Sequence, residues 1–378
     1  MFGFNASGVT AAGAFFCGLL FLFIIGIYWG RCTKYPIDKR QNGTPLLFFL
    51  ITLFALTAWY QGDFFVYMRN VVVDFYVGIK SFHLENIYVY IIELTGQNYI
   101  LFRLVIWGGA LAFFLCTVKN YRLNATLSLF LMFLLFASIF SYARASLAMA
   151  VYFLGLSVFC KGHNKKKSIL AITGVCVIMS SYLFHKSMAV VIILTVFYFI
   201  PISKKTILPI LFIVAVFGVF IDSYMDTFME SLMSMGDNHL ADKIDEVMNG
   251  DTERRGAIGA TFFGWISILW AYVPFYLSFI LVAFIFFKDQ KKCSSEMTGL
   301  FRITFAIVIL STSILVFSAK SLTFFYRYLY MSFIPLSILI AYLLENKRME
   351  KKQYKLILFL GGGYNIITFL SYVINYVR

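Results

Sequence analysis

The sequence predicts an all-α fold, a polytopic integral membrane protein of about 12 transmembrane helices. Hydrophobic residues make up 61% of the 378 positions and charged residues only 13%, which is too little polar surface for a water-soluble globule of this size. The mean hydropathy is +0.83. The apolar runs reach about 20 residues, the helical length that crosses a hydrocarbon core of roughly 30 Å. They do not show the alternation over about ten residues that is typical of a transmembrane β-strand.

The apolar runs give the expected spans in order. Residues 1–10 lack the basic segment of a cleavable signal peptide, so the first run is expected to remain as a span. The two spans beside His185 are short, so residues 169–200 form two spans, a re-entrant hairpin or one broken helix. The twelve spans are 11–29, 45–59, 99–118, 123–142, 145–160, 168–184, 188–200, 206–221, 261–287, 303–319, 322–344 and 356–372.

Basic clusters occupy every second loop and set the expected orientation. These loops hold about 20 of the 32 basic residues and about five of the 18 acidic ones, which predicts that they are cytoplasmic and that both termini lie outside. The net charge of +14 is therefore topological rather than a sign of nucleic-acid binding. The clusters are Arg31/Lys34/Lys39/Arg40, Lys119/Arg122, Lys161/Lys165/Lys166/Lys167, Lys204/Lys205, Lys288/Lys291/Lys292 and Lys347/Arg348/Lys351/Lys352/Lys355.

Two extracytoplasmic segments interrupt what we expect to be a single membrane-embedded domain, 1–378. The first is 61–98. The second, 222–260, is acidic and contains FMESLMSM and ADKIDEVM, a pattern typical of amphipathic helices that lie on a surface.

Several cations fall on the expected outer side, where the positive-inside rule does not explain them. Guanidinium groups hold phosphate oxygens in pairs and keep their charge, so such a group of cations suits a lipid-linked phosphate or pyrophosphate. Snorkelling and local carboxylate pairs are the alternative explanations. The cations are Arg69, Arg103, Arg144, Lys186, Arg254, Arg255, Lys320 and Arg327.

Two residues near these cations are candidates for proton transfer. The imidazole of His185 suits a general base acting on a sugar hydroxyl, although a lone histidine is more often structural. Asp63 follows a span and a glycine, where a carboxylate serves as a base or caps a helix. Trp59, Tyr67, Tyr88, Tyr90 and Tyr326 suit either stacking on sugars or an interfacial aromatic belt.

No metal or cofactor is expected. The histidines and the six cysteines lack metal-ligand spacing, and the predicted outer face shows no pair of aspartates of the DxD type.

Five motifs make the chain resemble the EpsG-like branch of the Wzy-type O-antigen and capsular polysaccharide polymerases. They cover roughly 59–191 and 324–339. The acidic segment 222–260 matches no motif of the family, and Ala145 follows the arginine of SYARASLAMAV where the family commonly has glutamine. In order, the motifs are GDFFVYM, ENIYVYIIELTGQNYILFRLVI, SYARASLAMAV, FHKSMAVVI and FFYRYLYM leading to IPLSIL.

The resemblance implies a GT-C-like membrane glycosyltransferase of the bacterial inner membrane, with its active site facing outward. It implies transfer of a growing glycan from undecaprenyl pyrophosphate to an undecaprenyl-pyrophosphate-linked repeat unit. A chain-length regulator is the expected protein partner. Arg144, Arg327, Lys186, Arg69, Arg103 and Lys320 are then the candidates for pyrophosphate, and Tyr67, Tyr326, Arg254 and Arg255 for glycan.

Two other classes of protein remain open at this stage. A lipid-linked oligosaccharide flippase or transporter also has many spans, but it usually keeps both termini in the cytoplasm and its polar residues near the membrane midplane. An O-antigen ligase-like transferase would use the same arginine and pyrophosphate chemistry.

Overall fold

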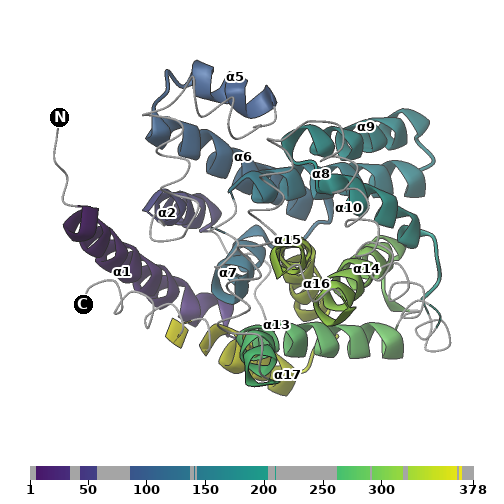
Figure 1. The fold of residues 1–378 in the computed structure, drawn as a ribbon. Coiled ribbons are helices and arrows are strands. Elements are labelled where there is room, and N and C mark those ends of the chain that lie inside the picture. Colours follow the sequence, from purple (N-terminus) through teal and green to yellow (C-terminus); the bar gives the residue numbers. More distant parts are fainter. Residues whose placement is uncertain are drawn as a thin grey trace. The chain divides into compact units, whose positions relative to one another are not determined.

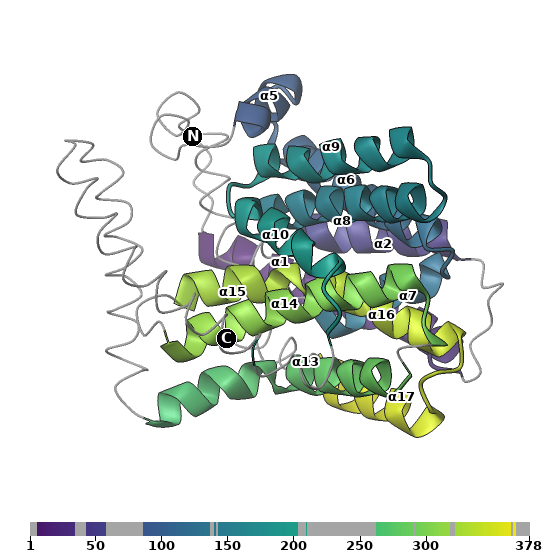
Figure 2. The same ribbon diagram turned by 90° about the vertical axis from the view of Figure 1, so that its right-hand side faces the viewer.

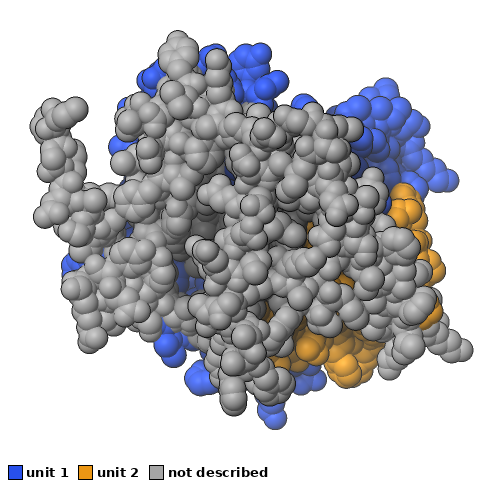
Figure 3. Space-filling model, in the orientation of Figure 1, with its two compact units in different colours: residues 1–193, 333–378 blue, residues 194–332 orange. Residues whose placement is uncertain are grey.

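The structure is a computed structural model and describes residues 6–34, 43–57, 86–136, 140, 143–202, 209, 262–289, 292–317, 322–363 and 366–367. All regular structure within these ranges is helical, which agrees with the predicted all-α class. The chain divides into two compact units, coloured separately in Figure 3. Unit 1 is Met1–Ile193 with Phe333–Arg378, and unit 2 is Leu194–Ser332.

Unit 1 contains most of the described helices (Figure 1). The start of α6, both ends of α9 and the start of α10 coincide with predicted span ends. In order, its elements are α1 (Ala6–Cys32), α2 (Thr44–Thr57), α5 (Asn86–Leu94), α6 (Tyr99–Asn120), α7 (Ala125–Phe136), α8 (Ala143–Asn164), α9 (Ser168–Phe184), most of α10 (Met188–Leu194), α16 (Phe333–Glu345), α17 (Lys351–Ile357) and a π-helical turn (Leu358–Gly363).

Helix α7 is the centre of unit 1. Every side chain from Thr126 to Phe136 is buried, and α1, α2, α6 and α16 pack around it. A helix surrounded by other helices has no face in contact with water, which is why α7 is apolar on all sides. On one side of it, Phe133 meets the edge of the Phe54 ring (5.0 Å between centroids), and on another Phe136 stacks on Phe333 (4.8 Å).

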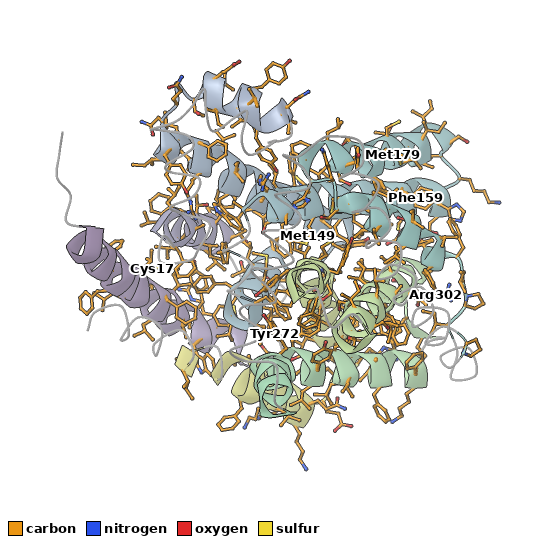
Figure 4. The ribbon with its side chains drawn as sticks, in the orientation of Figure 1. Cys17, Met149, Phe159, Met179, Tyr272 and Arg302 are labelled. Atoms are coloured by element: carbon orange, nitrogen blue, oxygen red, sulfur yellow. The ribbon has the colours of Figure 1, made fainter. Side chains whose placement is uncertain are left out.

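Helices α8 and α9 form an antiparallel pair with almost touching backbones, side by side in Figure 2. A Cβ on Gly155 would stand 2.6 Å from the amide nitrogen of Ile178, and a Cβ on Gly174 would overlap the backbone of Phe159, labelled in Figure 4. Small residues are what allow membrane helices to approach this closely. Glycine is therefore required at both positions.

Helices α6 and α8 run parallel to each other. Gly109, in the middle of α6, lies against the Leu147 side chain in the second turn of α8, and the Asn120 amide donates to Ser157 Oγ (2.9 Å) further towards the C-terminal ends of both helices. The N-termini of α6 and α8 and the C-terminus of α9 therefore lie at one end of unit 1.

The basic loops of unit 1 gather at the opposite end. The backbone N–H of Asn124 donates to Glu345 Oε1 (2.6 Å), and the Tyr354 hydroxyl donates to the Cys32 carbonyl (2.6 Å). Burial, with a smaller effect of the Cys32 thiol, raises the pKa of Tyr354, so this hydroxyl keeps its proton. The basic residues at this end are Arg31, Lys34, Lys119, Arg122, Lys161, Lys165, Lys166, Lys167, Lys347, Arg348, Lys351, Lys352 and Lys355.

Unit 2 consists of the 3-10 helix η3 (Thr195–Tyr198), α13 (Phe262–Asp289), α14 (Ser295–Phe317) and α15 (Leu322–Met331). Aromatic rings join α13 and α14 in antiparallel register, with Phe286 stacked on Phe301 (4.7 Å between centroids). The hydroxyl groups of Tyr276 and Thr312 lie 3.1 Å apart further along the same pair.

In three places the helices differ from the predicted spans. The predicted span 322–344 forms two helices, α15 and α16, which are separated only by a turn at Ser332, because Pro335 has no N–H to donate to the Met331 carbonyl. The stretch Tyr328–Glu345 across this turn is still long and apolar enough to span. The predicted start at 303 moves back to Ser295, so Arg302 lies inside α14. The predicted start at 356 moves back to Lys351, because the Glu350 N–H donates to Gln353 Oε1 (2.9 Å) and caps α17.

Five of the described helices are long and apolar enough to cross a membrane, which supports a polytopic membrane protein. The expected span 206–221, apart from Pro209, the segment 222–260 and most of the segment 61–98 lie outside the described residues. The spanning stretches are Phe15–Cys32, Tyr99–Asn120, Ala143–Asn164, Ser295–Ile314 and Tyr328–Glu345.

Candidate functional site

The candidate site that can be built from described residues is the end of unit 1 opposite the basic loops. Arg103 is in the first turns of α6, Arg144 is the second residue of α8, and His185 directly follows α9. Because α6 and α8 are parallel and α9 is antiparallel to them, these residues and Lys186 lie at the same end. The four residues therefore share one end of unit 1, and their roles stay predictions.

Arg144 is half-buried under helix α5. The Tyr88 hydroxyl of α5 donates to the Arg144 carbonyl (3.2 Å), and the Tyr88 ring is fully buried with its edge against Phe102 (6.5 Å). Tyr88 therefore positions the start of α8 and has no face exposed for sugar stacking. The sequence prediction missed this support, because Tyr88 and Arg144 are far apart in the chain.

The N-terminus of α8 adds an electrostatic component at Arg144. The first N–H groups of a helix have no partner within the helix, and the helix dipole places partial positive charge there. The guanidinium and the dipole therefore both favour an anion at this end of α8.

His185 is held in a tight turn between α9 and α10. The Ser187 backbone N–H donates to His185 Nδ1 (3.2 Å), and the His185 carbonyl accepts from the Met188 N–H (2.9 Å). A neutral imidazole that accepts at Nδ1 carries its proton on Nε2. In this state Nε2 is the N–H donor of the ring. Lys186, the next residue, is exposed.

Arg103 is the most buried of the four residues, with 7% of its surface exposed. Its guanidinium donates to the Ala55 carbonyl in the last turn of α2 (2.6 Å) and lies 5.9 Å from the Tyr99 ring centroid. A cation at a helix C-terminus satisfies carbonyls that have no partner within the helix. Arg103 therefore joins α6 to α2. The spacing of Tyr99 and Arg103, one helical turn, is the only sequence signal of this arrangement.

The remaining predicted site residues cannot be placed as side chains. Arg327 and Tyr326 belong to α15, but their side chains lie outside the described part of the structure. Asp63, Tyr67, Arg69, Arg254, Arg255 and Lys320 lie outside the described residues altogether.

Arg302 is a further cation within a span, half-buried on α14 in unit 2 (Figure 4). Its guanidinium donates to the Tyr198 carbonyl at the end of η3 (3.1 Å), and Gly299, one turn earlier, lies against the Tyr198 ring. This pair fixes η3 on α14. The sequence prediction missed it because the predicted span began one residue after Arg302.

The described residues contain no group of three or more histidine, cysteine, aspartate or glutamate side chains that could hold a metal ion.

The model of the EpsG family matches residues 43–378. The chain belongs to the EpsG family. This result confirms the resemblance found in the sequence motifs, and it makes the EpsG-family chain a polysaccharide-polymerase-type membrane protein of the glycosyltransferase-like kind. Neither a curated protein nor a solved structure matches the chain.

Proposed function

We propose that this EpsG-family chain is an O-antigen, capsule or exopolysaccharide repeat-unit polymerase. It transfers the growing glycan from undecaprenyl pyrophosphate to an undecaprenyl-pyrophosphate-linked repeat unit, at the outer face of the bacterial inner membrane. The observation that carries the proposal is that Arg144 and His185 lie at the same end of unit 1, away from the basic loops.

The reaction breaks the bond between the anomeric carbon and the pyrophosphate oxygen and forms a bond to the acceptor hydroxyl oxygen. Negative charge develops on the departing undecaprenyl pyrophosphate, so fixed cations stabilise the transition state more than the ground state. In this proposal Arg144 and Arg327 hold the pyrophosphate, and Lys186, Arg69 and Lys320 assist. Arg103 contributes by orienting α6 through the Ala55 carbonyl. Neither a metal nor a cofactor is part of the proposal.

The acceptor hydroxyl must lose a proton, and the proposal gives this task to Asp63. His185 Nδ1 accepts a hydrogen bond from the Ser187 N–H. A neutral imidazole that accepts at Nδ1 carries its proton on Nε2, which supports a donor role for His185. In this proposal the Nε2–H of His185 donates a hydrogen bond to an oxygen of the pyrophosphate or of the transferred sugar. Tyr67, Tyr326, Arg254 and Arg255 are assigned to the glycan.

The proposal includes a finer architecture. About 12 spans form a single GT-C-like membrane domain with both termini outside the cytoplasm, and segments 61–98 and 222–260 contact the glycan on the outer side. A chain-length regulator is the proposed protein partner.

The decisive experiment compares Arg144→Ala and Arg327→Ala with Lys165→Ala in cells whose own copy of the gene is deleted. We expect the two arginine variants to accumulate single-unit product while the protein remains in the membrane, because removing one such donor slows a step by roughly 100- to 1000-fold. Lys165→Ala, at the opposite end, should make long chains.

Normal chain length in both arginine variants would refute the proposal. Complete loss of lipid-attached glycan, rather than retention of one unit, would instead indicate a ligase. Accumulation of the repeat unit on the cytoplasmic face would indicate a flippase.

A further inference from the structure

Helices α6, α8 and α16 end in the same backbone motif at the basic end of unit 1. The second residue after each helix has a positive φ: 59° at Arg122, 53° at Lys166 and 54° at Lys347. The next N–H then bonds back to the helix, from Leu123 to Val118 (3.1 Å) and from Arg348 to Leu343 (2.8 Å). This 6→1 hydrogen bond is the mark of a Schellman cap.

Glycine is the usual residue at this position, because a Cβ disfavours the left-handed backbone. Lysine or arginine nevertheless occupies it in all three helices. Among the described non-glycine residues with positive φ, Gln97 is the one that is not basic. A cap alone would favour glycine, and the positive-inside rule requires only a cation somewhere in the loop. A cation at this particular position therefore needs a further reason.

Arg122 and Lys347 are neighbours in the fold. The hydrogen bond from the Asn124 N–H to Glu345 Oε1 joins their two turns, and each of the two cations is two residues from one of these partners. Both side chains are exposed. They extend beyond the C-termini of α6 and α16, and so past the ends of two apolar helices that qualify as spans or parts of spans.

An apolar surface leads to these cations along α6. Ala112 and Cys116 are exposed at a spacing of one turn, and exposed Lys119 continues the same face towards Arg122. In a membrane protein such a face contacts acyl chains, and the cations at its end reach the depth of the headgroups.

We propose that Arg122 and Lys347 bind the phosphate group of an anionic phospholipid, whose acyl chain lies along the Ala112 and Cys116 face of α6. Arginine holds two phosphate oxygens in its fixed fork, and lysine supplies a second charge on a flexible stem. The apolar face selects a lipid over a free anion. This site lies at the end of unit 1 opposite Arg144 and His185 and does not depend on the proposed polymerase activity.

The test is a titration of phosphatidylglycerol into the purified protein in neutral detergent, followed by the thermal unfolding midpoint. The wild-type midpoint should rise with phosphatidylglycerol and not with phosphatidylcholine or inorganic phosphate. In R122G/K347G the midpoint without lipid should be equal or higher, because glycine suits both caps. The same rise should then need roughly 30-fold more phosphatidylglycerol, since each cation near an anionic surface contributes about fivefold.

The matched control is K352Q/K355Q, which also removes two positive charges from exposed lysines at this end, on the regular helix α17. It should respond to phosphatidylglycerol as the wild type does. The proposal is overturned if R122G/K347G keeps the wild-type response, if the control loses as much affinity, or if inorganic phosphate reproduces the rise.

Discussion

The two ends of unit 1 use cations in opposite ways. At the basic end, many lysines and arginines are exposed, and three of them sit in left-handed caps. At the other end the described cations are few: the Arg103 guanidinium donates to the Ala55 carbonyl, and the backbone carbonyl of Arg144 accepts from the Tyr88 hydroxyl. The cations of the first region are mostly exposed, whereas the guanidinium of Arg103 in the second is positioned by packing. Substitutions at the two ends should therefore change stability and activity by different amounts, and the change in stability should even differ in sign.

The largest expected effect comes from the α8–α9 contact that holds Arg144 and His185 at one end. Gly174→Ala places a Cβ on the Phe159 backbone and should lower the free energy of unfolding by about 3 kcal/mol. Thermal unfolding in detergent measures this change. Gly108→Ala on α6 is the control, since a Cβ there meets nothing within 4 Å. Equal midpoints for the two variants would contradict the close packing.

The next effect concerns the proton on His185. His185→Ala should slow polymer formation by roughly 100-fold, the lower range for a group that moves or shares a proton in the transition state. His185→Gln, whose amide N–H stands near the place of Nε2–H, should recover part of this rate. In vitro polymerisation of lipid-linked repeat units measures both. If Gln is as slow as Ala, the donor role is wrong and His185 is better described as a base.

A smaller effect is expected at Arg103, the buried cation. Arg103→Met leaves the Ala55 carbonyl without its charged donor and should lower the free energy of unfolding by about 2 kcal/mol. Lys119→Met removes an exposed cation from the other end of the same helix and should change it by less than about 0.5 kcal/mol. Similar losses in the two variants would remove the distinction between the ends.

The smallest effect has the opposite sign. Lys166→Gly relieves a left-handed cap and should raise the free energy of unfolding in neutral detergent by up to about 1 kcal/mol. Lys161→Gly, within regular α8, should lower it by about 1 kcal/mol. A destabilising Lys166→Gly would show that the lysine side chain itself contributes to the cap.

Hydropathy located the helices well where a charged turn marks the end of a helix. Helix α9 has its predicted limits, since Lys167 precedes it and His185 follows it. Where polar residues continue a helix, prediction failed: Lys351 and Lys352 resembled a loop, but the Glu350 and Gln353 cap makes them the start of α17. Pro335 is visible in the sequence as a residue that disfavours a continuous helix, but the prediction overlooked it inside an apolar run.

The candidate site was only partly accessible to prediction. The order of the basic loops in the sequence predicts that Arg144 and His185 lie at the end away from those loops, as they do in unit 1. The burial of Arg103 against Ala55 and of Tyr88 against Phe102 does not, because hydropathy specifies which residues enter the membrane and not which helices become neighbours.

By itself, the sequence determined that this protein is helical and crosses a membrane several times, because long apolar runs in lipid must satisfy their backbone hydrogen bonds internally. Its motifs also indicated the EpsG family. Tertiary structure alone decided which cations are positioned by protein groups and which are exposed. Glycines at α8 and α9, and hydrogen bonds between residues distant in the chain, set that division. Such contacts depend on the three-dimensional packing of side chains, which a one-dimensional pattern of apolar and charged residues does not encode.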